Sequence, residues 1–283
     1  MSTAILKIRC IDSRGIVYAL SKYILERQGN IIHSTQHHDP ESNYFFIWIK
    51  IDILQMNCTR GVFESGFQKL ADKFKMTWQV RYADQIKRMA ILVSKHDHCL
   101  YDLILRQKYG ELQVDIPLII SNHPDLENVG QHFKIPYHHI PVPSGDKEKS
   151  EQSILDLCKK NAVDFMVLAR YMQILGKTLL NAYPNEIINV HHGFLPAFVG
   201  AKPYHQAYEK GVKIIGATGH YATEDLDMGP IIEQQTVRVD HSMGPGDMIT
   251  LGRDIETQVL ATAVKAHIDD RIFVYNNRTI IFN

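Results

Sequence analysis

The first 82 residues alternate between strand-like and helix-like hydrophobic patterns. From Phe45 to Ile53 every second residue is apolar, which is typical of a strand buried on one face. Between residues 16 and 24, and again between 63 and 74, the apolar residues recur at helical spacing. The order of strand, helix, strand, strand, helix, strand predicts a ferredoxin-like domain over residues 1–82. Its other strands are expected at 4–11, 31–38 and 77–82.

After a polar linker at residues 83–87, the pattern changes to strands that alternate with helices over residues 88–283. The short apolar runs LIIS at 118–121 and FMVLA at 165–169 suit central parallel strands that are covered on both faces. The alternation predicts a doubly wound, Rossmann-like α/β domain. Its strands are expected at 89–94, 117–121, 164–169, 187–190, 213–221 and 231–238, and its helices at 99–109, 125–132, 149–161, 203–210 and 247–266.

Composition and charge narrow the class of partner. The chain has 283 residues, enough for two domains, and its 31 basic and 31 acidic residues give a formal net charge of zero. A protein that binds nucleic acid or an anionic membrane mainly through charge is normally basic, so neither is expected as a partner. The four cysteines are scattered, without a C-x-x-C pair, and no leader-like or membrane-spanning apolar run is present. We therefore expect a cytoplasmic protein that acts on a small molecule.

Three segments that follow predicted strands of the second domain could carry chemistry, because open α/β sheets bind ligands at the carboxyl ends of their strands. Asn189 and His191 lie two residues apart, so their side chains face one site, although the histidine could equally cap a loop. Asp227 stands in an acidic loop at 223–230, where it could act as an acid or base beside the imidazole or belong to a solvated turn. Residues 168–175 could line a pocket for a flat heterocycle or form an ordinary connection.

These segments resemble the folate-dependent formyltransferase family. The order N-x-H-x-x-x-L-P at Asn189–Pro196 is followed by L-D-x-G-P at Leu226–Pro230. The run PYHQAYEKGVKIIGATGHY at 203–221 is closer to the 10-formyltetrahydrofolate deformylases, and the closing segment RIFVYNNRTII fits them too. The N-terminal unit resembles an ACT domain, which these deformylases carry and the transferases generally lack. One departure is Gly193, where the resemblance predicts a serine, and the lost hydroxyl bears on rate more than on reaction type.

The resemblance implies a hydrolase that converts 10-formyltetrahydrofolate and water to tetrahydrofolate and formate, supplies formate for purine synthesis and balances the one-carbon pool. Asp227 would activate the water, and Asn189 with a protonated His191 would stabilise the tetrahedral oxyanion. Neither a metal nor another cofactor is expected, since the sequence has no H-E-x-x-H motif. The residues expected to contact the folate are Met172, Gln173, Ile174, Leu175, Glu224, Asp225 and Leu226.

By the same resemblance, the first domain is expected to bind an amino acid, glycine or methionine, between the subunits of a homo-oligomer. Asp12, Gly15 and Asn30 are the candidate contacts, and a pure assembly module is the alternative. Two other functions stay open: a formyltransferase that acts on glycinamide ribonucleotide, and an amino-acid sensor whose catalytic domain has decayed. The loop KHDHCL at 95–100 favours water as the acceptor, because it has no glycine that would let a backbone N–H approach a phosphate. The intact catalytic set argues against decay.

Overall fold

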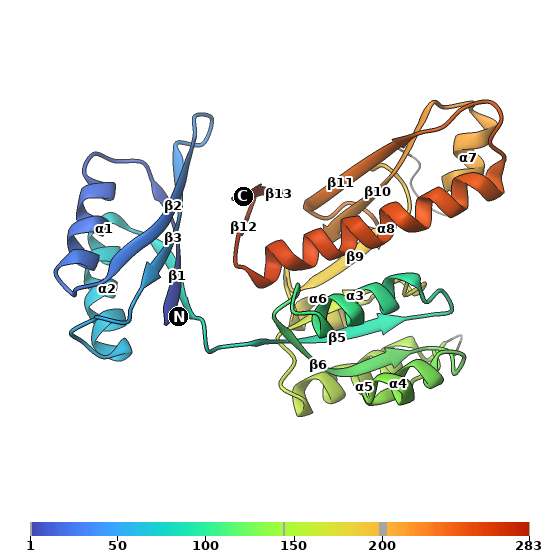
Figure 1. Ribbon diagram of the computed structural model, residues 1–283, viewed down its shortest axis with the longest axis horizontal. Helices are drawn as coiled ribbons and strands as arrows, with labels where there is room; N and C mark the ends of the chain where they lie inside the picture. The colour runs from blue at the N-terminus through green and yellow to red at the C-terminus, as the bar shows by residue number, and fades with distance from the viewer. Residues whose placement is uncertain (1, 144, 198–202, 283) are drawn as a thin grey trace. The chain divides into compact units, whose positions relative to one another are not determined.

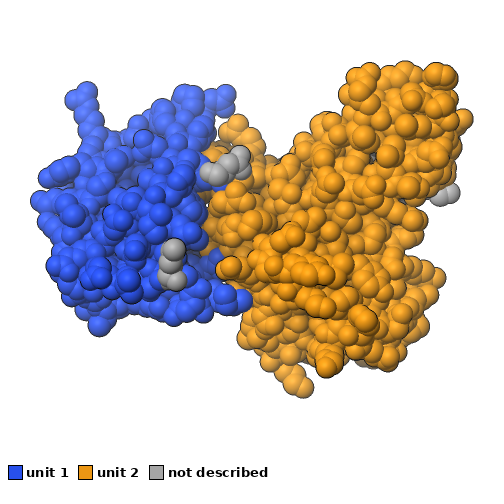
Figure 2. Space-filling model, in the orientation of Figure 1, with its two compact units in different colours: residues 1–86, 282–283 blue, residues 87–281 orange. Residues whose placement is uncertain are grey.

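The computed structural model describes residues 2–143, 145–197 and 203–282, which divide into two compact units (Figures 1 and 2). One unit comprises the chain up to Ile86 together with its end from Phe282, and the other comprises Lys87–Ile281. Lys87, which the sequence placed in the linker, begins the first strand of the second unit. Within the described ranges, no helix has both the length and the apolar character that a membrane crossing requires.

The first unit is a four-stranded antiparallel sheet with two helices. Strands β1 (Thr3–Ile11), β2 (Asn30–Asp39), β3 (Tyr44–Asp52) and β4 (Thr77–Tyr82) lie in the order β2-β3-β1-β4. Helix α1 (Ile16–Leu25) connects β1 to β2, and α2 (Arg60–Phe74) connects β3 to β4, so the element order predicted from the sequence is confirmed. Alternate residues of β3 from Phe45 to Ile51 pack in one core, as the period of two predicted.

An aromatic cluster fills the core of this unit. The ring of Phe67 on α2 meets Tyr23 on α1 edge to face, with ring centroids 5.4 Å apart. It also contacts Trp78 on β4 at 4.7 Å, again at an edge-on angle. Edge-to-face pairs of this kind stabilise a core beyond the burial of their area. Phe67 is fully buried, so it joins both helices to the sheet.

The second unit is built on a seven-stranded sheet in the order β11-β10-β9-β8-β5-β6-β7. The strands from β9 to β7 are mutually parallel, as the doubly wound pattern predicted. Strands β10 and β11 are antiparallel to their neighbours, because each begins at the end of the sheet where the preceding strand finishes. The strands are β5 (Lys87–Val93), β6 (Val114–Ser121), β7 (Tyr137–His139), β8 (Phe165–Leu168), β9 (Ile187–His191), β10 (Ile214–Tyr221) and β11 (Ile231–Arg238).

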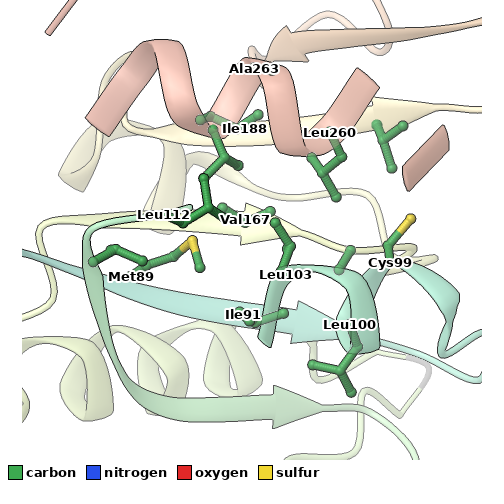
Figure 3. Close-up of a cluster of buried hydrophobic side chains, with 14 of the residues drawn as sticks. Met89, Ile91, Cys99, Leu100, Leu103, Leu112, Val167, Ile188, Leu260 and Ala263 are labelled. Carbon is green, nitrogen blue, oxygen red and sulfur yellow. The ribbon is translucent and has the colours of Figure 1, made fainter. Parts of the chain in front are cut away.

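Helices cover both faces of this sheet. Figure 3 shows one of the two cores, in which Ile91 of β5, Val167 of β8 and Ile188 of β9 pack against Leu103 and Leu260. That face carries α3 (His98–Lys108), α4 (Glu127–Phe133) and α8 (Pro245–Ile268), and the opposite face carries α5 (Lys147–Lys160) and α6 (Lys177–Ala182). Helix α7 (Pro203–Glu209) packs on α8, and β12 (Ile272–Tyr275) pairs with β13 (Arg278–Ile281) as a closing hairpin. The sequence analysis did not anticipate β7 and α6, which are too short for a clear hydrophobic period.

We predict that Phe67→Ala destabilises the first unit by about 3–5 kcal/mol, because truncation of a fully buried ring removes its contacts and leaves a cavity. Both tryptophans, Trp48 and Trp78, belong to this unit, so urea unfolding followed by tryptophan fluorescence reports on it selectively. Val62→Ala on the same helix is the matched control, since that side chain is 55% exposed. Equal midpoints for the two variants would contradict the packing described here.

Candidate active site

Strand β9 presents the pair of polar side chains that the sequence singled out. Its residues Ile188 and Val190 belong to the core beneath α8, so alternation along the strand turns Asn189 and His191 to the other face of the sheet. The neighbouring strand β10 runs antiparallel, with His220 opposite Asn189. A β-bulge immediately before His220 shifts the pairing with β11, and bulges of this kind re-aim a side chain.

The loop between β10 and β11 brings Asp227 against this pair. Oδ2 of Asp227 lies 3.2 Å from Nδ1 of His191, and Oδ1 lies 3.8 Å from Nε2 of His220. The side chains of His191 and Asp227 are only 5% and 6% exposed, so solvent screens their interaction weakly. Asp227 has a φ of 58°, a left-handed conformation that aspartate adopts more readily than most residues. The structure therefore brings together all three residues proposed as catalytic from the sequence.

A glycine allows this loop to fold back along the sheet. A Cβ atom at Gly229 would overlap the carbonyl oxygen of Tyr221, so only glycine can occupy this position. The N–H of Met228 donates to the carbonyl of Asp225 at 3.2 Å, and Nδ2 of Asn277 donates to the carbonyl of Met228 at 3.0 Å. These bonds fix the backbone on both sides of Asp227.

His220 orients the amide of Asn189. Its Nδ1 lies 2.9 Å from the carbonyl oxygen of Tyr221, and we assign the ring proton to this nitrogen because a carbonyl can only accept. Nε2 then accepts a hydrogen bond from Nδ2 of Asn189 at 3.1 Å. Burial lowers the pKa of His220, so the ring is neutral, as this tautomer requires. The amide of Asn189 has a second N–H that this bond does not use.

His192 forms the adjoining part of the wall. Its ring centroid lies 5.4 Å from that of His191 and 6.0 Å from that of Tyr204. Burial and the positive charge of Arg170 lower the pKa of His192 to about 3, so its imidazole is neutral near pH 7. The rings of His192 and His220 both line the pocket described next.

A pocket of about 330 Å³ opens over these residues, a volume within the usual range for a small-molecule site. Its wall includes Arg170 and Tyr171, which lie in the segment 168–175 that the sequence analysis proposed as a pocket lining, and also Thr223, which it did not assign to the folate. Glu224 and Asp225 are exposed and do not line it; Glu224 instead pairs with Lys177 at 3.3 Å. Five residues expected to contact the folate do lie in the wall: Met172, Gln173, Ile174, Leu175 and Leu226.

Two buried side chains anchor the loop at 170–176. Oγ of Ser94, at the end of β5, accepts a hydrogen bond from the N–H of Met172 at 2.9 Å. The carboxylate of Glu151 on α5 accepts from the N–H of Gly176 at 2.5 Å, where α6 begins. A Cβ at position 176 would lie 2.8 Å from that carboxylate, so glycine permits the approach. The sequence analysis missed both anchors because their partners lie 78 and 25 residues away along the chain.

A group of side chains behind the pocket has the composition of a metal site. A ring nitrogen of His98, Sγ of Cys99 and a carboxylate oxygen of Glu256 lie within 4.8 Å of one another. Burial raises the pKa of Cys99 well above its usual value, so the sulfur is protonated and a poor ligand. Nε of Arg170 lies 3.5 Å from Glu256 and contributes a positive charge that opposes a cation. The group is therefore better suited to an internal ion-pair network than to a metal.

The candidate effector residues of the first unit lie at two different ends of its sheet. Asp12 follows β1, where its N–H donates to the carbonyl of Asn43 at 2.8 Å. Gly15 follows it and precedes α1, with a left-handed φ of 89°. Asn30 begins β2 opposite Asp52, at the end where β1 starts. The three residues therefore do not form one cluster within a single chain.

The geometry around Asp227 suits acid–base chemistry at a carbonyl group. A buried carboxylate provides a base, and an imidazole 3.2 Å away provides an acid and a hydrogen-bond donor. The amide of Asn189 provides a second donor on the same face of the sheet. A base with two adjacent donors can promote the attack of water on an acyl group and stabilise the resulting oxyanion.

Comparison with known proteins agrees with this chemistry. Residues 87–264 match the family model described as Formyl transferase. A protein of Synechocystis sp. named formyltetrahydrofolate deformylase is 48% identical over 280 residues, which cover 99% of this chain and 98% of that one. The crystal structure of a formyltetrahydrofolate deformylase from Pseudomonas syringae has a TM-score of 0.98 and 43% identity, covering 100% of this chain and 95% of that chain. Glycinamide ribonucleotide transformylase 1 from Symbiobacterium toebii has a TM-score of 0.67 and 26% identity, covering 71% of this chain and 97% of that chain.

We predict that the free energy of unfolding of the second unit decreases as the pH falls below about 6.5. The pKa of His192 is near 3 when folded, so between these values the unfolded state binds the extra proton and acid favours unfolding. The contribution of His192 is about 1.4 kcal/mol for each pH unit below 6.5. His192→Gln should reduce this slope, whereas His205→Gln, at an exposed position, should not. Urea unfolding at pH 7 and pH 5, followed by circular dichroism, measures both; identical slopes in the two variants would exclude this origin.

Proposed function

The chain belongs to the Formyl transferase family and, within it, to the formyltetrahydrofolate deformylases, which hydrolyse 10-formyltetrahydrofolate; on this premise we propose that Asn189, His191 and Asp227 carry out the hydrolysis. The observation that carries the proposal is the contact of 3.2 Å between the buried carboxylate of Asp227 and the imidazole of His191, at the wall of a pocket. The products are tetrahydrofolate and formate, and we propose that the formate supplies purine synthesis and the one-carbon pool.

In the first step, Asp227 orients a water molecule and accepts its proton as the oxygen attacks the formyl carbon. The carboxylate is suited to this because it is buried, and its backbone is fixed by the turn at 225–229. His191 Nδ1 lies beside Oδ2, which leaves Nε2 of the same ring on the side away from the carboxylate. A base that is positioned in this way contributes about 10²–10⁴-fold to a rate.

The tetrahedral intermediate carries its negative charge on the former formyl oxygen. Nε2–H of a protonated His191 and the second N–H of Asn189 are the donors that would stabilise this charge. Asn189 needs no reorganisation, because its bond to His220 already holds the amide in place. A donor that is oriented before the reaction stabilises an oxyanion by about 3–4 kcal/mol.

Collapse of the intermediate breaks the bond between the formyl carbon and the folate nitrogen. His191 delivers a proton to that nitrogen, and formate and tetrahydrofolate leave. In these steps each proton is transferred by Asp227 or His191, so the proposed proton transfers use only these two side chains. The folate ring would lie against the loop at 171–175, whose backbone Ser94 and Glu151 hold in position.

We predict that Asp227→Asn lowers turnover by about 10²–10⁴-fold, because an amide cannot accept the proton of water. His191→Ala and Asn189→Ala should each cost about 10²–10³-fold through loss of an oxyanion donor. The measurement is formate release from 10-formyltetrahydrofolate with water as the only acceptor. Asp225→Asn is the matched control, because this exposed carboxylate in the same loop does not line the pocket. Near-normal turnover of Asp227→Asn at saturating folate would remove Asp227 from its proposed role.

We propose that the first unit is an ACT domain that binds glycine or methionine where two copies of the chain meet. Its strand order β2-β3-β1-β4, with helices α1 and α2 packed in one core, supports the assignment. Asp12 and Asn30 lie at different ends of one sheet, so a shared site requires Asp12 and Gly15 from one copy and Asn30 from another. Strand β2 has an edge that no other described strand covers, where a second copy could pair.

Binding of the amino acid should change turnover at the second unit by about 5- to 150-fold in either direction, the usual range for coupled sites. Calorimetry of the full chain with glycine and with methionine measures the binding, and formate release measures the coupling. Asp12→Ala should abolish both effects, whereas Glu41→Ala, at an exposed turn of the same unit, should preserve them. If neither amino acid binds, the unit serves in assembly alone.

A further inference from the structure

Four polar side chains from four different elements meet behind the pocket. Oε2 of Glu256, on α8, lies 2.9 Å from Nε2 of His98, at the start of α3. The hydroxyl of Tyr204, on α7, donates to Oε1 of the same carboxylate at 2.9 Å. Nε of Arg170, after β8, lies 3.5 Å from Oε2. The proposed hydrolysis uses none of these four side chains, which we call the Glu256 network.

Glu256 is the buried centre of the Glu256 network. Its side chain is 2% exposed, and burial alone would raise its pKa. The hydrogen bond from His98 and the charge of Arg170 outweigh this effect and lower the pKa, so the carboxylate is ionised. Gly252 lies one helical turn before it, where any Cβ would overlap the ring of Tyr204. The glycine at position 252 of α8 therefore leaves the room that the ring of Tyr204 needs to reach Glu256.

Arg170 is the member of the Glu256 network that reaches the pocket wall. Its φ is 61°, a left-handed conformation that bulky residues rarely adopt. The side chain is only 11% exposed, and its Nε and Nη1 have no hydrogen-bond partner among the described residues. Packing and the charge of Glu256, rather than backbone preference, hold the arginine in this position.

The position of Arg170 bears on which nucleophile can reach the formyl carbon. Outside residues 171–175, the wall of the pocket includes Arg170 and His192 beside the proposed catalytic residues. Water needs no further room next to the formyl carbon, whereas an amine acceptor needs additional volume there. The side chain of Arg170 and the Glu256 network behind it fill volume at this part of the wall. The transformylase of Symbiobacterium toebii, whose name states that it acts on glycinamide ribonucleotide, has a similar fold over 71% of this chain.

We propose that Arg170, held by the Glu256 network, determines the specificity of the reaction by filling the space that an amine acceptor would occupy. The inference rests on the proposed hydrolytic function and adds the residue that makes water the acceptor. It gives a role to an arginine that stands in a backbone conformation that glycine would adopt without strain.

Removal of the arginine side chain should open a second reaction. The nitrogen of a small amine would attack the formyl carbon, the bond from that carbon to the folate nitrogen would break, and a new C–N bond would remain. The proton lost by the amine would pass to the folate nitrogen through Asp227 and His191. The products are tetrahydrofolate and an N-formyl amine, with no oxidant or reductant involved.

The test measures how the formyl group divides between formate and amine in Arg170→Gly and Arg170→Ala. The probe is glycinamide, which is small and carries no phosphate. Its binding therefore does not depend on the loop at 95–100, which lacks the glycine that a phosphate-binding loop would need. The wild type should release formate alone, with glycinamide or with glycinamide ribonucleotide. In both variants N-formylglycinamide should form, at roughly 10- to 200-fold above the detection limit that bounds the wild type, the range typical of pocket discrimination by size.

Three control variants distinguish the loss of side-chain volume at position 170 from the loss of charge, of backbone strain or of a buried ion pair. Arg170→Met keeps most of the volume without the charge and should still release formate alone; transfer to glycinamide by this variant would overturn the proposal. Asn185→Gly removes the same left-handed strain, at a φ of 58°, before β9 and away from the pocket. Asp270→Asn removes a buried ion pair with Lys87, 2.7 Å long, at the start of β5. Neither of these two should change the product ratio.

The result that overturns the proposal is a folded Arg170→Gly or Arg170→Ala that hydrolyses 10-formyltetrahydrofolate and forms no N-formylglycinamide at any concentration of glycinamide. If one of the two variants does not fold, the other decides. Absence of formate release by the wild type would instead refute the hydrolytic function, so the two failures are distinguishable. Detection of a formylated amine from the wild type would show that the Glu256 network does not exclude an acceptor.

Discussion

The antiparallel pairing of β10 with β9 is the constraint on which the site depends. It places His220 opposite Asn189 and Thr218 opposite His191, and the loop after β10 then returns Asp227 to the same place. Side chains alternate across a strand, so a slip by one residue would turn Asn189 and His191 into the apolar core beneath α8. The packing of the core and the geometry of the site therefore require the same pairing register between β9 and β10.

The electrostatics of the site follow from its burial. His192 and His220 each lie near a carboxylate, Glu256 and Asp227 respectively, yet desolvation lowers the pKa of both rings and keeps them neutral. A neutral His220 can accept from Asn189, and a neutral His192 places no positive charge next to His191. The low dielectric that favours neutral imidazoles also strengthens the interaction of Asp227 with His191. The pair formed by Asp227 and His191 is therefore the one to which the proposed acid–base chemistry is assigned.

Much of the fold could be predicted from the sequence, because it rests on local hydrophobic patterns. Alternation in β3 and the apolar runs of β6 and β8 encode burial directly, whereas β7 and α6 are too short to show a period. The reversed direction of β10 could not be predicted, since strand patterns do not reveal orientation. Asn189, His191 and Asp227 were singled out by residue type and resemblance, and the structure brings them together. Ser94, Glu151 and Glu256 were missed, because their contacts are with residues distant in sequence, and the ion pair of Arg170 with Glu256 was missed for the same reason.

Gly229 is constrained by the geometry of the backbone, whereas the proposed role of Asp227 is chemical. Its hydrogen is all that fits against the carbonyl of Tyr221, so the requirement for glycine comes from the backbone and not from the reaction. Under the proposed mechanism, a descendant that lost Asp227 would lose turnover but would still need this glycine in order to fold. Among diverging copies of such a gene, the glycine would therefore follow the architecture, and the carboxylate two positions before it would follow the proposed activity.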